Sequence, residues 1–266
     1  MNLVQISDPN DPRIAVYRDI RERDLARREG MFIAEGKVVL DVLFSAGRFV
    51  PHSALILENR LQGMAPVLAK APAGMPVFVA RQEVIDRVAG FHLHRGVLAA
   101  AARGEGSDAT TLLARLPASA LVLVLVGISN HDNVGAIFRN AAAFGADAVL
   151  LDATCCDPLY RKAIRVSVGA ALKVPFIIGG DAAGLFGLLS AAGFRQYALS
   201  PSGATDIRHL RRPRRAALYL GAEGEGLPAS LMAMMRTVRI AIAPGFDSLN
   251  VAAASAVALH RLARLD

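Results

Sequence analysis

Short apolar runs alternate with amphipathic segments along residues 108–266. Residues 121–126 are a continuous run of Leu and Val, which is typical of a strand buried on both faces of a parallel sheet. An amphipathic pattern predicts a helix over 133–144, and the apolar run 148–151 predicts a second buried strand. The alternation continues with predicted strands at 174–178, 197–199, 217–220 and 238–242 and a helix at 249–262. This order predicts an α/β domain in which helices cover both faces of a parallel sheet.

Residues 1–107 show a weaker form of the same alternation. The charged segment 12–28 predicts a helix, and a short strand at 32–34 precedes a helix at 38–43. A small polar run at 103–108 separates the two halves and predicts a linker. We therefore expect a small α/β domain over residues 1–107 and a larger one over 108–266. Further apolar runs in the first half lie at 54–57, 77–79 and 97–101.

The basic residues are almost all Arg. The 266-residue chain has 30 basic and 23 acidic side chains and a net charge of +7, yet only positions 37, 70, 162 and 173 are Lys. Because Arg binds phosphate in a bidentate manner and stacks on bases, this excess favours a nucleic-acid partner. A general compositional preference for Arg explains the same count equally well, so charge alone does not decide the partner.

Cysteine usage and hydropathy exclude several classes of protein. The adjacent Cys155 and Cys156 cannot build a disulfide framework or a zinc site, which favours a reducing compartment. The first residues lack the pattern of a signal peptide. The longest apolar run, 120–126, is far shorter than the ~20 residues that cross a bilayer. We expect a soluble cytoplasmic protein with no membrane partner.

Three polar loops follow predicted strands, where ligands of parallel α/β sheets bind. The first loop leads into the helix at 133–144, with Asp132 or Asn133 as the expected N-cap. Arg139 lies one and a half turns into that helix, a position where an isolated Arg is ordinarily a surface residue.

The second loop, 221–228, contains three glycines and Glu223. Such glycines let the backbone approach a ligand closely, or simply make a tight connection. The third loop, 244–250, has two candidates for the start of the last helix. Ser248 is a good N-cap, and Asn250 could equally well accept hydrogen bonds from the free N–H groups of the first turn.

Three other kinds of site do not fit the sequence. Gly127 and Gly135 in the first loop have the wrong spacing for a dinucleotide fingerprint, although Asp152 is well placed for its acidic residue. No P-loop motif occurs, and His92 and His94 lack a third metal ligand. We therefore expect neither a dinucleotide cofactor nor a metal.

The three loops together resemble the three motifs of the SpoU (TrmH-like) RNA 2′-O-ribose methyltransferases of the SPOUT superfamily. The first motif matches residues 133–139 and 144–146, the second 220–227 and the third 248–252. The segment 162–170 resembles the part of that family that precedes its third strand. This chain departs from the usual motifs of that family in two places. It lacks a Pro shortly before Asn133, and it has the sequence Ile-Ala-Ile-Ala-Pro-Gly at 240–245.

The first half adds a second resemblance. Residues 32–37, the following helix and residues 94–97 are similar to the small ribosomal-protein-like RNA-binding domain that often precedes the catalytic domain. The likeness therefore covers nearly the whole chain, and it implies that residues 1–107 bind the RNA substrate.

The resemblance implies a C-terminal trefoil knot, a homodimer with its active site at the interface, and S-adenosylmethionine as cofactor. Knots are rare among protein folds in general, so periodicity alone would not suggest one. The expected catalytic residue is Arg139, which would stabilise the oxyanion that forms on the ribose, because a guanidinium does not give up its proton. The residues expected to position it, the ribose or the cofactor loops are Asn133, Glu223, Ser248 and Asn250. Those expected near the cofactor are Gly221, Ile240 and Leu249.

The expected partner is structured RNA, rRNA or tRNA, rather than DNA. Five Arg lie in the run 208–215, and we expect Arg211 and Arg212 to contact the RNA backbone, with Arg165 as a further phosphate or partner-subunit contact. A solvated loop is the alternative for this run. For the whole protein, the alternative is a non-catalytic RNA-binding or ribosome-assembly factor on the same fold.

Overall fold

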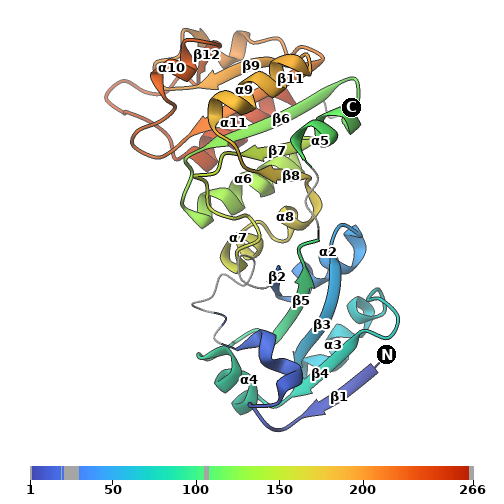
Figure 1. The fold of residues 1–266 in the computed structure, drawn as a ribbon. Coiled ribbons are helices and arrows are strands. Elements are labelled where there is room, and N and C mark those ends of the chain that lie inside the picture. Colours follow the sequence, from blue (N-terminus) through green and yellow to red (C-terminus); the bar gives the residue numbers. More distant parts are fainter. Residues whose placement is uncertain (1, 19, 21–29, 105–107, 264–266) are drawn as a thin grey trace. The chain divides into compact units, whose positions relative to one another are not determined.

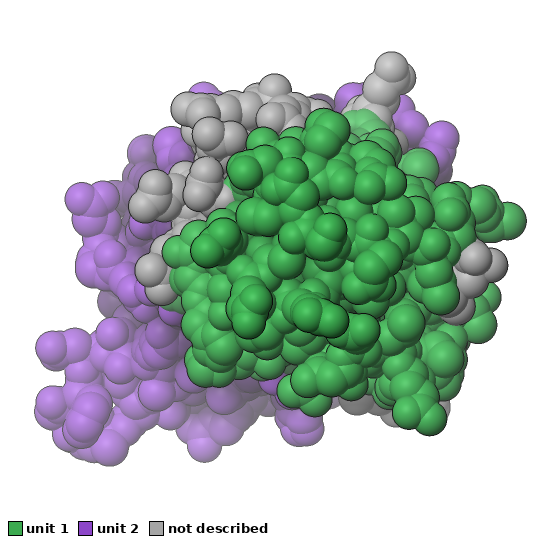
Figure 2. Space-filling view, turned by 90° about the horizontal axis from the view of Figure 1, so that it is seen from below, with its two compact units in different colours: residues 1–105, 159–173 green, residues 106–158, 174–266 purple. Residues whose placement is uncertain are grey.

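The computed structural model describes residues 2–18, 20, 30–104 and 108–263. The chain forms two compact units, coloured separately in Figure 2. Unit 1 comprises residues 1–105 and 159–173, and unit 2 comprises residues 106–158 and 174–266. The division after residue 105 lies close to the expected linker. The segment 159–173 differs from expectation, because its contacts place it with unit 1.

The sheet of unit 2 is parallel throughout its described strands (Figure 1). Its strand order is β10-β12-β9-β11-β6-β7-β8. The chain runs outward from β6 to β8 and then returns to the other side of β6, which makes the β6–β11 border a topological switch point. The strands are β6 (Ala120–Val126), β7 (Ala148–Leu151), β8 (Phe176–Ile178), β9 (Arg195–Leu199), β10 (Thr205–Asp206), β11 (Arg215–Gly221) and β12 (Arg236–Arg239).

Both faces of this sheet are covered, as the continuous apolar strands predict. Val122 and Val124 of β6 share a buried cluster with Leu113, Leu185 and Leu189 from helices on one face. Every residue of β6 is buried, including those that point to the opposite face. The helices of unit 2 are α5 (Ala109–Arg115), α6 (His131–Ala143), α9 (Ala182–Ala191), α10 (Ala229–Met232) and α11 (Val251–Leu262).

Unit 1 is the small α/β domain that the sequence predicts. Its strand order is β1-β4-β3-β5-β2, with β5 antiparallel to both of its neighbours. Its strands are β1 (Asn2–Ile6), β2 (Met31–Glu35), β3 (Val50–Leu57), β4 (Pro76–Ala80) and β5 (Val97–Ala102). The α-helices among its described residues are α2 (Lys37–Ala46), α3 (Leu61–Leu68), α4 (Gln82–Ala89), α7 (Arg161–Val166) and α8 (Ala170–Lys173).

Several predicted elements differ in detail. Of the helix expected over 12–28, the described part is a 3-10 helix, Pro12–Tyr17, and residues 19 and 21–29 lie outside the described residues. The apolar pattern did not predict β1, whose side chains are mostly exposed, or the two-residue β10. β12 ends at Arg239, earlier than expected. The knot stays a prediction. No helix among the described residues is long and apolar enough to cross a membrane.

Candidate active site at the ends of the parallel strands

A cavity of about 390 Å³ lies in unit 2 where β9 and β11 end. Its walls come from the ends of these strands, from the segments that follow them and β12, and from the start of α11. This is the edge of a parallel α/β sheet where ligands bind. Most of the lining is apolar or glycine, with a few polar groups. The lining residues are Leu199, Ser200, Pro201, Leu220, Gly221, Ala222, Glu223, Gly224, Gly226, Ile240, Ile242, Ser248, Leu249, Asn250, Val251 and Ala254.

The glycine loop after β11 folds tightly back on itself. The N–H of Gly226 donates to the carbonyl of Ala222 at 3.0 Å. A Cβ on Gly221 would lie 2.3 Å from the carbonyl carbon of Gly226, so no side chain fits there. Gly224 and Gly226 have φ of +88° and +71°, which glycine adopts without strain. The glycines therefore shape a close backbone turn along the cavity wall.

Three polar side chains from distant parts of the chain meet beside this turn. Asn133 on α6 donates from Nδ2 to Oε1 of Glu223 at 2.6 Å. Asn250 donates from Nδ2 to the same Oε1 and to Oδ1 of Asn133, both at 3.0 Å. Asn133 follows β6 and Glu223 follows β11, and these strands are adjacent in the sheet. The fold thus joins one residue from each of the three predicted loops.

The cap of α6 differs from expectation, and the cap of α11 is one of its two expected candidates. α6 begins at His131, and its N-cap is Asn130, whose Oδ1 accepts a hydrogen bond from the N–H of Asp132 at 2.8 Å. Neither Asp132 nor Asn133 is the cap, because both already lie in the first turn. This frees the amide of Asn133 for Glu223. For α11, Asn250 is the cap rather than Ser248, since its Oδ1 accepts from the N–H groups of Ala252 and Ala253.

Asp152 has a structural role that the sequence could not show. Its carboxylate is buried after β7, and its Oδ1 accepts from the N–H groups of Gly127, Thr154 and Cys155 and from the hydroxyl of Thr154. It therefore ties the loop after β6 to the loop after β7. Burial raises the pKa of the neighbouring Cys155 thiol to about 12, with the charge of Asp152 adding to the effect.

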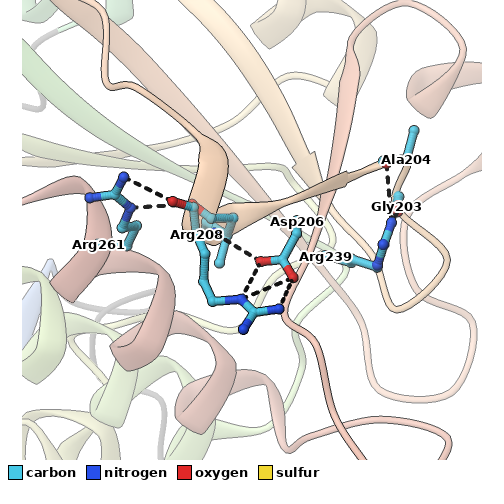
Figure 3. Close-up of polar contacts among 7 residues, drawn as sticks. Gly203, Ala204, Asp206, Arg208, Arg239 and Arg261 are labelled. Carbon is cyan, nitrogen blue, oxygen red and sulfur yellow. Dashed lines mark hydrogen bonds and ion pairs between the residues drawn. The ribbon is translucent and has the colours of Figure 1, made fainter.

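The cavity wall at 199–201 is one part of the site that sequence patterns missed. The chain beyond it, through β10 and as far as Arg208, is held by arginines that donate to backbone carbonyls (Figure 3). Arg239 donates from Nη1 to the carbonyls of Gly203 and Ala204 at 2.7 and 3.1 Å. Arg261 of α11 donates from Nη2 to the carbonyl of Arg208 at 3.0 Å. The only sequence signal for this wall was its place directly after a strand.

The same segment contains a local ion pair. Arg208 donates from Nη2 to Oδ2 of Asp206 at 2.7 Å, and its backbone N–H donates to Oδ1 (Figure 3). These hydrogen bonds from Arg208 lower the pKa of Asp206 to about 2. Arg208 therefore has a partner within the protein.

The predicted site residues fall into two groups. Gly221, Glu223, Ile240, Ser248, Leu249 and Asn250 line the cavity, and Asn133 contacts two residues of its rim. Arg139 is exposed on α6 and does not line this cavity. Arg165 belongs to unit 1.

The arginine run 208–215 is not a uniformly free surface. Arg212 donates to the carbonyl of Leu262 at 3.1 Å, and Arg215 donates to the carbonyl of Leu113 and lies over the ring of Phe194. Arg211 and Arg214 are exposed. RNA contact by Arg211 and Arg212 stays a prediction.

The described residues contain no group of three or more His, Cys, Asp or Glu that could hold a metal ion. His92 and His94 stack edge to face, and Nδ1 of His92 lies 2.7 Å from Asp86. They lie in the loop that follows α4.

These features define a class: a parallel α/β protein with a ligand cavity at the carboxyl ends of its strands. A model of the SpoU rRNA methylase family matches residues 120–260. An uncharacterized tRNA/rRNA methyltransferase of Mycobacterium tuberculosis is 38% identical over 99% of this chain and 93% of its own length. One from Synechocystis is 27% identical over 99% of this chain and 94% of its own. The chain therefore belongs to the SpoU rRNA methylase family of RNA methyltransferases.

Solved structures resemble the whole chain as well. A crystal structure of an RNA 2′-O ribose methyltransferase has a TM-score of 0.80 at 25% identity, covering 97% of this chain and 98% of that one. An AdoMet-bound rRNA methyltransferase from Sinorhizobium meliloti has a TM-score of 0.82 at 22% identity, covering 98% and 97%. The second likeness shows a shared fold.

Proposed function

We propose that this protein transfers a methyl group from S-adenosylmethionine to a ribose 2′-hydroxyl of structured RNA, either rRNA or tRNA. The observation that carries the proposal is the hydrogen-bonded cluster of Asn133, Glu223 and Asn250 at the rim of an apolar cavity. The resemblance to an RNA 2′-O ribose methyltransferase supports the ribose as acceptor.

The cavity fits a cofactor of this kind. Its volume of about 390 Å³ lies within the range of small-molecule sites, and such sites are mostly apolar with a few placed polar groups. Gly221, Ile240 and Leu249 would hold the cofactor, because they line the cavity and Gly221 leaves no side chain in the way. When bound, S-adenosylmethionine supplies a methyl group on a positively charged sulfur. The AdoMet-bound structure with the same fold supports this choice.

Glu223 is placed to orient the acceptor hydroxyl. Its Oε1 accepts hydrogen bonds from both asparagine amides, and its Oε2 accepts none from the described residues. In our proposal Oε2 accepts the ribose hydroxyl proton as a hydrogen bond, and the hydroxyl of Ser248 borders the same cavity. Fixing the acceptor in this way favours an in-line approach, which can lower the barrier by several kcal/mol.

Arg139 is proposed to act from a second copy of the chain. It is exposed on α6 and does not line the cavity of its own chain. In a homodimer whose interface includes α6 and the adjacent α11, this guanidinium would reach the partner's cavity and stabilise the oxyanion that develops on the ribose as the methyl group is transferred. The RNA phosphate or solvent would take the hydroxyl proton. The 45% exposure of the apolar Val257 on α11 is consistent with such an interface.

The direct test is methyl transfer from labelled S-adenosylmethionine to size-fractionated total RNA from a strain that lacks this protein. Label recovered as a 2′-O-methylnucleoside in one RNA class would support the proposal and identify the substrate. Label on a base would contradict the ribose as acceptor. Absence of both label and cofactor binding would favour the alternative, a non-catalytic RNA-binding or ribosome-assembly factor.

A further inference from the structure

Unit 1 contains a second cavity, of about 690 Å³. It lies among the end of β2, the first turn of α2, the start of α3, the loop before β5, and α7. Its charged and polar lining includes Lys37, Arg60, His94, Arg95 and Arg165. The cavity thus brings together the two segments around residues 35–37 and 94–96 that the sequence analysis singled out in the first half.

The charges in this cavity leave a clear positive excess. The one acidic group in its lining, Glu35, has a side chain only 5% exposed and is paired with Arg161 at 2.5 Å and with Arg165 at 3.8 Å. Among the residues that the structure describes, Lys37, Arg60 and Arg95 form no ion pair. The cavity therefore offers unneutralised cations to an anion.

The backbone at the same place adds hydrogen-bond donors. α2 has Gly36 as its N-cap, with no side chain that could satisfy the N–H groups of the first turn. A Cβ at position 36 would lie 3.3 Å from Nη1 of Arg95, so glycine allows this guanidinium to lie close to the start of the helix. Side-chain cations and backbone donors thus lie together at one edge of the cavity.

The rest of the lining is apolar. Val38, which is 59% exposed, borders the cavity together with Val39, Met64 and Val97. An apolar surface beside phosphate-binding groups matches the two chemical parts of a nucleotide, the base and the phosphate. A base inside a duplex is not accessible to such a concave site, whereas an unpaired base in an RNA loop can be splayed out into it.

We infer that the cavity of unit 1 binds one unpaired nucleotide of the substrate RNA, with its phosphate at Lys37, Arg60 and Arg95 and its base on the apolar surface. This inference rests on the proposed function, because it makes the cavity a second contact for the RNA that is methylated. It assigns part of the RNA recognition to a site on unit 1.

Two matched pairs of substitutions in the full-length chain test the inference. Gly63→Glu places a carboxylate at the cavity, and Gly187→Glu places one on α9 of unit 2; at both helix positions an added Cβ meets nothing within 4 Å. Arg95→Ala removes a cavity cation, and Arg87→Ala removes an exposed cation of α4 in the same unit. Each pair changes the net charge equally.

The probes are a labelled pool of RNA hairpins with a randomised unpaired loop and a fully paired RNA duplex of equal length. We expect Gly63→Glu and Arg95→Ala to weaken hairpin binding about tenfold, as the loss of a direct nucleotide contact does. Gly187→Glu and Arg87→Ala should stay within about twofold, since exposed charges at a distance are screened by salt. Duplex binding should be weaker than hairpin binding and change little in all four variants.

The inference would be overturned if the cavity variant and its control in each pair lost the same hairpin affinity. It would also be overturned if the unsubstituted protein bound the hairpins and the duplex equally well. Binding of S-adenosylmethionine, measured by calorimetry, and label transfer to total RNA separate this result from the proposed function. If cofactor binding and transfer are intact while the cavity variants bind like their controls, only the cavity assignment fails. If the unsubstituted protein transfers no label, the proposed function fails independently of the hairpin result.

Discussion

Asn250 uses both ends of its side-chain amide. The oxygen caps α11 by accepting from two backbone N–H groups, and the nitrogen donates to Glu223 and Asn133. The beginning of a helix and the polar cluster of the site therefore depend on one residue. Substitutions that keep one role and remove the other can separate the two.

Asn250→Asp retains a capping oxygen but loses the N–H donors and places a second carboxylate beside Glu223. Asn250→Ala loses the cap as well, which costs about 1 kcal/mol of stability. We expect both variants to lose methyl transfer. The double variant Asn250→Asp/Glu223→Gln should be more stable in urea unfolding than Asn250→Asp alone, because the introduced glutamine amide can donate to the introduced Asp carboxylate. A double variant no more stable than Asn250→Asp alone would show that the contact does not form in solution.

The turn after β11 lies close to the end of the strand that it follows. A side chain at position 221 would overlap the backbone of Gly226 and Leu227. This close backbone contact fixes the shape of the cavity wall, because the turn cannot shift without moving the end of β11.

Gly221→Ala should therefore destabilise the fold by about 1–3 kcal/mol, as insertion of a methyl group into a packed site does. It should also weaken binding of S-adenosylmethionine in calorimetry, because the wall must move. Gly187→Ala is the control, since a Cβ on that α9 position meets nothing and Ala favours a helix. Unchanged cofactor binding in Gly221→Ala would contradict the place of this turn in the cofactor site.

The ion pair between Asp206 of β10 and Arg208 provides a pH-dependent test. The pKa of Asp206 is lowered to about 2, so its pairing with Arg208 stabilises the fold above about pH 4 and is lost progressively as the pH falls toward 2. Asp206→Asn should lower the melting temperature at pH 7, and the difference from the unsubstituted protein should narrow at pH 3. A difference that is constant with pH would show that the charge of Asp206 does not contribute.

Periodicity predicted most strands of both units, because buried strands are continuous apolar runs. Among the described helices it predicted bounds only for those that correspond to α2, α6 and α11. It did not predict β1, whose exposed side chains lack that pattern, or β10, which is too short to have one. For the site, the loops after β6 and β11 could be singled out from sequence, and their meeting follows from the adjacency of the two strands. The cap of α6 was misplaced by two or three residues, since Asn130, Asp132 and Asn133 are all good capping residues.

The proposed dimer makes Arg139 and Glu223 parts of the same site from different chains. Arg139→Ala and Glu223→Ala should each abolish methyl transfer. Mixed under conditions that allow subunit exchange, the two variants should recover about a quarter of the activity, because half of the dimers are mixed and each has one intact site.

The control is each variant exchanged with itself, which should remain inactive. Mixed dimers can be counted through different affinity tags on the two variants. Mixed dimers that form but transfer no methyl group would place Arg139 and Glu223 of one site on the same chain.

The pairing of Glu35 with Arg161 bears on how this chain can be recombined with its relatives. The two residues belong to one compact unit but are separated in sequence by the first two strands and the first two helices of the other. A chimera joined at the linker near residue 105 would inherit Glu35 from one parent and position 161 from the other. If the second parent lacks a cation at that position, a carboxylate that is 5% exposed is left without its main partner, which costs about 3–5 kcal/mol. The two halves of this gene are therefore not freely exchangeable modules, and a working exchange must transfer residues 159–173 together with the first 105.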